Sequence, residues 1–195
     1  SALFLQTGVP ISGIANNGFL SANLGTGSNS AVPPGQAVLR FYTQFADSSK
    51  VSYTWNASLA DSQAAFLNGD LALYLGYASE ARYLTQANPN LNFEVSPLPQ
   101  PGTAGNKSSY GLVYALMIPR GAKNGTGAYL VAQKLSGIAG NQALTNATGL
   151  APTNRTLLAT PPSDPVAAVA YSSALYAKGW LSPASSDTNA VFSGM

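Results

Sequence analysis

The stretch at residues 66–79, FLNGDLALYLGYAS, constrains the fold of this chain more than any other segment. It reads as a helix end, a tight turn at residues 68–70, and an apolar run at residues 71–75 that stops at a glycine. An apolar run of large side chains bounded by glycines is typical of a strand buried on both faces. In open α/β sheets, ligands gather outside the carboxyl ends of such strands, so we expect residues 76–79 to lie at a site.

Composition indicates a globular protein with a weakly charged surface. The chain has 195 residues and is 46% apolar, which is enough to build a core. Charged residues make up only 8%, against about 25% in ordinary soluble domains, so Ser, Thr, Asn, Gln and Gly must carry the surface. Such a surface suits an extracellular protein that binds neutral ligands.

Charge and residue types exclude several functions. The net charge of +2 comes from residues scattered singly, with no basic cluster to neutralise phosphates, so no nucleic acid partner is expected. The chain has no Cys and no His, and therefore lacks thiolate metal ligands, disulfides and the commonest general base. Glycines at residues 25–27 and 102–105 lack the spacing of a phosphate-binding loop. The sequence predicts no metal and no cofactor.

Helical and strand patterns alternate along the chain, which favours an α/β fold class. Helices are expected at residues 1–6, 34–47, 59–67, 79–87, 128–135, 141–147, 155–159 and 165–178. Buried strands are expected at residues 71–75, 91–97 and 110–119, with a short strand at 9–11 and a strand or extended loop at 51–55. Ser58, with Asp61 three residues later, resembles a capping box at the start of the third helix, and Gly149 is expected to end the sixth.

Five segments in this order resemble motifs of one protein family. They are residues 66–73 (F-x-x-G-x-x-A-M), 93–99 (f-x-v-x-P-l-P), 110–123 (a strand ending in an I-P turn), 149–152 (G-x-x-P) and 177–180 (a Trp-containing segment). Their joint order and spacing are similar to the extracellular solute-binding proteins of family 1. These are the carbohydrate-binding, maltose-binding-protein-like receptors of ABC importers. The resemblance covers about residues 41–195.

The resemblance implies a type II periplasmic-binding-protein-like α/β fold, in which two lobes close on a ligand through a hinge. It assigns residues 1–98 to the second lobe, 99–109 to a hinge linker, 110–160 to a segment returning to the first lobe, and 161–195 to a helical segment back on the second. The chain is thus expected to be a C-terminal fragment, mainly the second lobe with part of the first.

The same resemblance implies a function. We expect the substrate-binding component of an ABC-type importer, which is not an enzyme and binds a small neutral solute, a sugar or oligosaccharide, in an interlobe cleft. Its partner would be a membrane permease, and the protein would be a monomer. It would be extracellular or periplasmic, with any lipid anchor carried by a leader before Ser1.

Sugar sites stack an aromatic face against the C–H face of the ring and satisfy the hydroxyls with polar groups. Three aromatic residues, Trp55, Tyr77 and Trp180, lie in loops where the family presents such side chains, although each could instead fill the core. The ligand-binding residues that we predict are Trp55, Gly76, Tyr77, Ala78, Ser79 and Trp180.

Two other functions remain open at this point. One is a lobe that serves as a surface-displayed interaction domain. The other is a glycoside hydrolase with a carboxylate pair among Asp70, Glu80 and Glu94, which would need two carboxyl groups roughly 5 to 10 Å apart. The positions of these residues in a turn and an alternating segment do not favour such a pair.

Overall fold

The computed structural model describes residues 1–8, 10–25, 32–101, 107–180, 182, 187 and 190. The chain divides into two compact units. The first comprises Ser1–Leu59, Gln100–Leu112 and Ala177–Met195, and the second comprises Ala60–Pro99 and Val113–Tyr176. One passage between the units, at Pro99 and Gln100, coincides with the start of the predicted linker at residues 99–109, of which 102–106 lie outside the described residues. The assignment of segments to family lobes stays a prediction.

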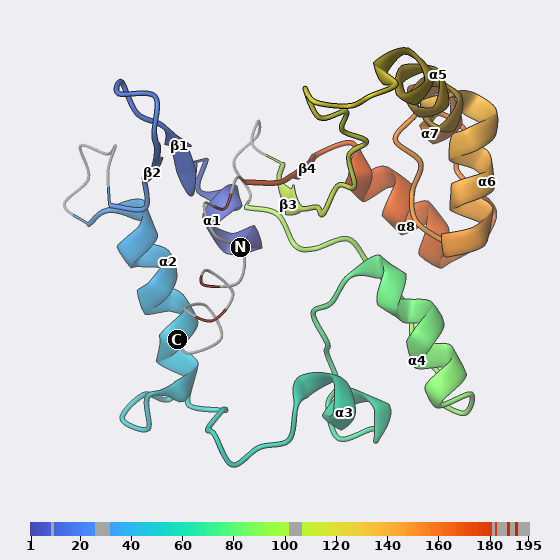
Figure 1. The fold of residues 1–195 in the computed structure, drawn as a ribbon. Helices are drawn as coiled ribbons and strands as arrows, with labels where there is room; N and C mark the ends of the chain where they lie inside the picture. The colour runs from blue at the N-terminus through green and yellow to red at the C-terminus, as the bar shows by residue number, and fades with distance from the viewer. Residues whose placement is uncertain are drawn as a thin grey trace. The chain divides into compact units, whose positions relative to one another are not determined.

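The first unit combines short helices with two small sheets (Figure 1). Its elements are α1 (Ala2–Gln6), β1 (Ser12–Ile14), β2 (Leu20–Ala22), α2 (Pro34–Thr43), the 3-10 turn η1 (Gln44–Ala46), β3 (Ser109–Tyr110) and β4 (Ala177–Lys178). Strands β1 and β2 form an antiparallel hairpin, whereas β3 and β4 pair in parallel. Gly18 has a φ of 79° in the hairpin turn, which glycine adopts without strain. Pro34 lies in the first turn of α2, as predicted.

In the core of the first unit, residues from the start of the chain contact residues that come much later in the sequence. Its buried centre consists of Phe4, Leu5 and Ile11. The half-buried residues packed around it are Leu24, Val38, Leu39, Tyr110 and Trp180. Trp180 follows β4, so the pairing of β4 with β3 brings the late part of the chain onto α1.

The second unit is helical in its described part. Its elements are α3 (Ser62–Leu67), the 3-10 turn η2 (Ala78–Glu80), α4 (Ala81–Ala87), α5 (Gly125–Ser136), α6 (Ile138–Thr148), α7 (Arg155–Leu158) and α8 (Pro165–Ala174). Helix α6 lies beside α5 and α7, and α8 contacts η2 (Figure 1). Side-chain N-caps explain where three of these helices begin. Asp61 accepts from Gln63 N (2.9 Å) at α3, and Asn124 accepts from Gly127 N (2.9 Å) at α5. Asp164 accepts from Ala167 N (2.8 Å) at α8.

A buried asparagine ties α5, α6 and the following segment together. Asn141 Nδ2 donates to Ser136 O (2.8 Å), and Asn141 Oδ1 accepts from Thr153 N (3.0 Å) and Thr153 Oγ1 (2.8 Å). Its amide is therefore satisfied on both sides, as a buried polar group must be. Gly149, at a φ of 72°, ends α6 in the left-handed conformation that the sequence predicts.

The predicted helices are confirmed with bounds that differ by a few residues, and two of these differences have a clear cause. Helix α3 begins at Ser62 under the cap of Asp61 rather than at Leu59, because the Ser58 hydroxyl is bonded to the side chain of Asn56. The last long helix ends at Ala174 rather than Lys178, because residues 177–178 pair with β3 as a strand.

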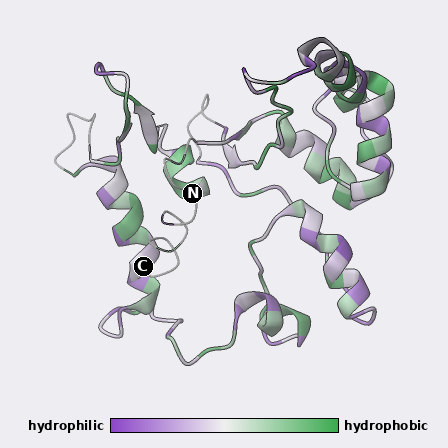
Figure 2. Cartoon of the chain, in the orientation of Figure 1, coloured by the Kyte–Doolittle hydropathy of each residue, from purple (hydrophilic) through white to green (hydrophobic). Residues whose placement is uncertain are grey.

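The prediction of three buried strands is wrong. Residues 71–75 and 91–97 belong to no strand, and of residues 110–119 only Tyr110 does. Leu73 is 84% exposed and Met117 is 87% exposed. A strand needs a neighbour for its backbone hydrogen bonds, and apart from Tyr110 no residue of these runs is assigned one within the described residues. Figure 2 shows the run between β3 and α5 as a hydrophobic connection.

The alternating pattern predicted for residues 91–97 is retained in the burial of their side chains, although they form no strand. Phe93 and Val95 are half-buried on one side while Glu94 between them is exposed, and the Phe93 ring meets Phe66 edge-on at 5.8 Å. Residues 51–55 form turns and a loop, the second of the two alternatives predicted for them. Of the short strand predicted at residues 9–11, Val9 lies outside the described residues, and the observed strand begins at Ser12.

Candidate functional site: the Trp180 hollow

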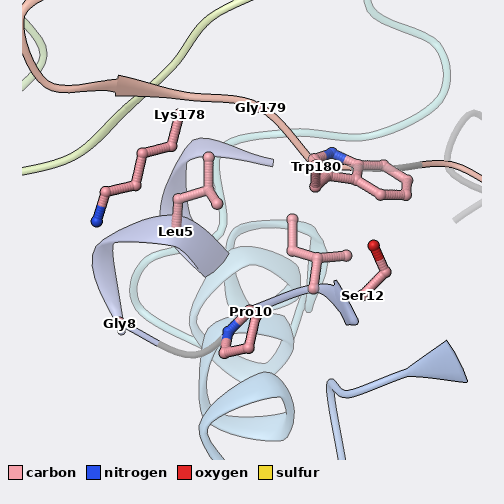
Figure 3. A pocket seen from close by; sticks show the side chains of 8 residues that line it. Leu5, Gly8, Pro10, Ser12, Lys178, Gly179 and Trp180 are labelled. Atoms are coloured by element: carbon pink, nitrogen blue, oxygen red, sulfur yellow. The ribbon is translucent and has the colours of Figure 1, made fainter. Parts of the chain in front are cut away.

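A hollow of about 340 Å³ opens in the first unit next to Trp180 (Figure 3). It is lined by Leu5, Gly8, Pro10, Ile11, Ser12, Lys178, Gly179 and Trp180, and we name it the Trp180 hollow. The lining comes from α1, from the connection to β1 and the first residue of β1, and from β4 with the two residues after it. This volume lies at the lower end of the range of about 300 to 1,000 Å³ found for small-molecule sites.

The parallel pairing of β3 and β4 positions Lys178, one of the residues that line the hollow. Gly111 N donates to Lys178 O (3.1 Å), which fixes the end of β4. A Cβ at Gly111 would lie only 2.8 Å from the Cβ of Ala177, so this close approach requires glycine. Gly179 and Trp180 then follow the carboxyl end of a parallel strand, which is where ligands gather in open α/β sheets.

The lining combines an apolar floor with a few polar groups. Leu5 and Ile11 belong to the buried core, and Trp180 packs half-buried against them. In Figure 3 the Lys178 side chain and the Trp180 indole lie toward opposite ends of the hollow, and the Ser12 hydroxyl lies near the indole. An apolar floor with an aromatic ring and a few hydrogen-bonding groups is the usual lining of a small-molecule site.

The predicted turn at Gly76, Tyr77, Ala78 and Ser79 belongs to the second unit, where one carboxylate shapes it. Glu80 Oε2 accepts from Tyr74 Oη (2.7 Å) and from Tyr77 N (3.2 Å), so it holds both sides of Gly76. A Cβ at Gly76 would overlap Glu80 Oε2 and lie 2.6 Å from the Tyr74 ring. Tyr77 itself is 48% exposed. Glu80 thus has a structural role, which weighs against its use as a hydrolytic carboxylate.

Tyr74 sits among groups that disfavour its ionised form. Its ring stacks on Phe66 with the centroids 5.6 Å apart, whereas Gln63 Nε2, which donates to its hydroxyl at 3.5 Å, acts in the opposite direction and lowers its pKa. Partial burial, followed by the hydrogen bond and the charge of Glu80, raises the pKa of Tyr74 from an ordinary value of 10 to about 12.

We expect this raised pKa to make stability fall at high pH. The unfolded phenol ionises near its ordinary pKa of about 10, so the stabilisation is fully present below that pH and is lost as the pH rises toward about 12. Tyrosinate absorbance of the wild type minus that of Tyr74→Phe should show a midpoint near 12. Glu80→Gln should lower that midpoint, because it removes the negative acceptor. A wild-type difference midpoint at the ordinary value would contradict this arrangement.

The other predicted site residues take separate places. Trp55 is 55% exposed in the loop after η1, where its backbone N–H donates to Phe45 O (3.1 Å), and it does not line the Trp180 hollow. Of the six predicted ligand contacts, Trp180 alone lines the hollow. The lining residues that the sequence did not single out are Leu5, Gly8, Pro10, Ile11 and Ser12. Lys178 and Gly179 were marked only as part of the Trp-containing segment.

The described part of the chain contains no group of three acidic residues able to hold a metal ion. Among the same residues, no helix combines the length and apolar character needed to cross a membrane.

A comparison of the sequence with protein families defines the class. The family described as bacterial extracellular solute-binding protein matches residues 6–171, which is most of the chain. The chain therefore belongs to the bacterial extracellular solute-binding proteins, and the predicted family is confirmed. Trp55 and Tyr77 lie inside the matched range, and Trp180 follows it. No match was found among curated proteins or among solved structures.

Family membership indicates the general function of the chain, which is solute binding. Extracellular solute binding is the property that the family description states. A mixture of helices and short strands is compatible with the predicted α/β class.

Proposed function

We propose that this chain supplies the substrate-binding component of an ABC-type importer and that its solute is a small sugar or oligosaccharide. The observation that carries this proposal is the Trp180 hollow, with its indole, its apolar floor of Leu5 and Ile11, and its polar edge. Family membership supports solute binding, and the chemistry of the lining supports a sugar. The partner would be the membrane permease that receives the solute, and the protein would act as a monomer.

We propose the turn at residues 76–79 as a second place of ligand contact, within its own unit. Glu80 holds the Tyr77 backbone, while about half of the Tyr77 side chain is exposed. An aromatic residue presented on a fixed backbone loses little conformational freedom when it binds. Gly76 lets the chain pass close to Glu80, and Ala78 and Ser79 begin η2. Trp55, also about half exposed, is a further proposed contact.

Titration calorimetry with a panel of neutral and acidic monosaccharides and disaccharides tests the proposal. We expect saturable binding of at least one sugar, and no heat from a matched panel of free amino acids. Binding of an amino acid with no response to any sugar would contradict the sugar assignment while leaving solute binding intact.

An interaction domain remains a second candidate because of one exposed apolar run. Within residues 113–118, Tyr114 is 81% exposed and Met117 is 87% exposed. Contiguous exposed apolar surface of this kind marks interaction sites. Sedimentation equilibrium distinguishes the two functions: self-association that Met117→Asp abolishes, together with no response in the sugar panel, would favour the interaction domain.

A further inference from the structure

We infer that the sugar held in the Trp180 hollow carries a carboxylate, as a uronic acid does, and that Lys178 binds this group. The inference rests on the proposed function and refines its substrate class from a neutral sugar to an acidic one. It depends on the kinds of hydrogen-bonding groups that line the hollow, on the charges of the first unit, and on the position of Lys178.

The polar side chains of the lining favour a ligand that accepts hydrogen bonds. Among the described residues that line the hollow, these side chains are Ser12, Lys178 and Trp180. The Lys178 ammonium only donates and the Ser12 hydroxyl both donates and accepts, while the Trp180 indole nitrogen is buried. The described lining includes no Asp, Glu, Asn or Gln, which are the side chains that accept from the hydroxyls of neutral sugars. A carboxylate accepts only, so it complements this lining better than another hydroxyl would.

No acidic residue of the lining neutralises Lys178. The first unit contains two acidic side chains, Asp47 and Asp187, and neither lines the Trp180 hollow. Asp47 accepts from Ser49 N (3.0 Å) and Ser49 Oγ (2.7 Å). These bonds and the charge of Lys50 hold the pKa of Asp47 below its ordinary value. Asp47 thus stays ionised beside Lys50, and within the described lining of the Trp180 hollow no carboxylate offsets the charge of Lys178.

The backbone holds Lys178 at one end of the hollow. Lys178 pairs with Tyr110 in the β3–β4 register, and its carbonyl accepts from Gly111 N. Figure 3 shows its side chain extending away from Trp180, with Leu5 between them. A pyranose on the apolar floor could place a ring face toward the Trp180 end and an acidic substituent toward the Lys178 end. Charge-assisted hydrogen bonds to that substituent are stronger than those to a neutral hydroxyl.

The test compares paired sugars that differ only in the acidic group, D-glucose with D-glucuronate and D-galactose with D-galacturonate, by calorimetry at low and high salt. We expect the wild type to bind at least one uronate about fivefold more tightly than its neutral partner, because a partly exposed charge pair contributes modestly. Added salt should weaken the uronate alone, since it screens the pair.

The Lys178→Met variant keeps the length of the side chain and removes its charge. It should reduce the uronate preference to about onefold and leave any binding of the neutral sugar in place. Lys107→Met is the matched control, because Lys107 is an exposed lysine of the same unit that does not line the hollow, and it should keep the preference. Equal wild-type affinity for the two members of each pair, or a preference that survives in Lys178→Met, would overturn the inference while the proposed function stands. Failure of the whole sugar panel to bind would overturn the proposed function itself.

Discussion

Replacement of Trp180 by Ala is expected to weaken sugar binding roughly thirtyfold. One face of the indole supplies about 80 Å² of apolar contact to a stacked sugar, worth about 2 kcal/mol, which is this factor in affinity. The indole also packs against Phe4, Leu5 and Ile11, so we expect the free energy of unfolding to fall by about 2 kcal/mol as well. Calorimetry at a temperature where the variant stays folded separates the two effects.

Two variants make the Trp180 result specific. Trp180→Phe keeps an aromatic face and should lose much less affinity than Trp180→Ala. Tyr42→Ala removes an aromatic side chain of the same unit that is 68% exposed and does not line the hollow, and its affinity should match the wild type. Wild-type affinity in a folded Trp180→Ala protein would show that the ligand binds elsewhere.

Replacement of Gly76 by Ala is expected to destabilise the second unit by about 1 to 3 kcal/mol, the usual cost of overpacking. The new methyl group would take the space of Glu80 Oε2 and press on the Tyr74 ring. Glu80 would then have to release the Tyr74 hydroxyl and the Tyr77 amide. Denaturant unfolding measures the loss, and the pKa of Tyr74 should fall toward its ordinary value at the same time.

Gly121→Ala is the matched control for this substitution. Gly121 also lies in the second unit, and a Cβ added there would meet no atom within 4 Å. Its stability should remain within about 0.5 kcal/mol of the wild type. If Gly76→Ala unfolded at the wild-type denaturant concentration with Tyr74 still titrating near 12, the role of Glu80 in the turn would be refuted.

The helices could be predicted from sequence because their signals are local. Pro34 in a first turn and Gly149 at an end both act through the conformation of one residue, and the structure confirms both. The start of α3 was misplaced because two capping side chains, Ser58 and Asp61, lie close together in sequence, and Asp61 makes the bonds to the helix. Local competition of this kind shifts a boundary by a few residues without removing the element.

The strands could not be predicted in the same way, because a strand depends on a partner elsewhere in the chain. The apolar run at residues 71–75 predicts burial, yet Leu73 and Leu75 are largely exposed. The two residues of β4, in contrast, were assigned to a helix and form a strand because β3 pairs with them.

The candidate site was predicted in part for a similar reason. Trp180 was recognised as a loop aromatic by its resemblance to the family pattern. Its neighbours in the hollow, such as Ile11 and Ser12, come from near the start of the sequence, and no local sequence pattern predicts that contact. The turn at residues 76–79 was predicted from a strand that the structure lacks, and its proposed role depends instead on Glu80 and Gly76.

The indole N–H resonances provide the most direct test of sugar binding in the Trp180 hollow. The protein has two tryptophans, so Trp55→Phe and Trp180→Phe assign the two signals. During titration with the tightest-binding sugar of the panel, we predict that the Trp180 signal shifts saturably, with the dissociation constant found by calorimetry. A Trp180 signal that stays in place while calorimetry reports binding would contradict the assignment of the sugar to this hollow.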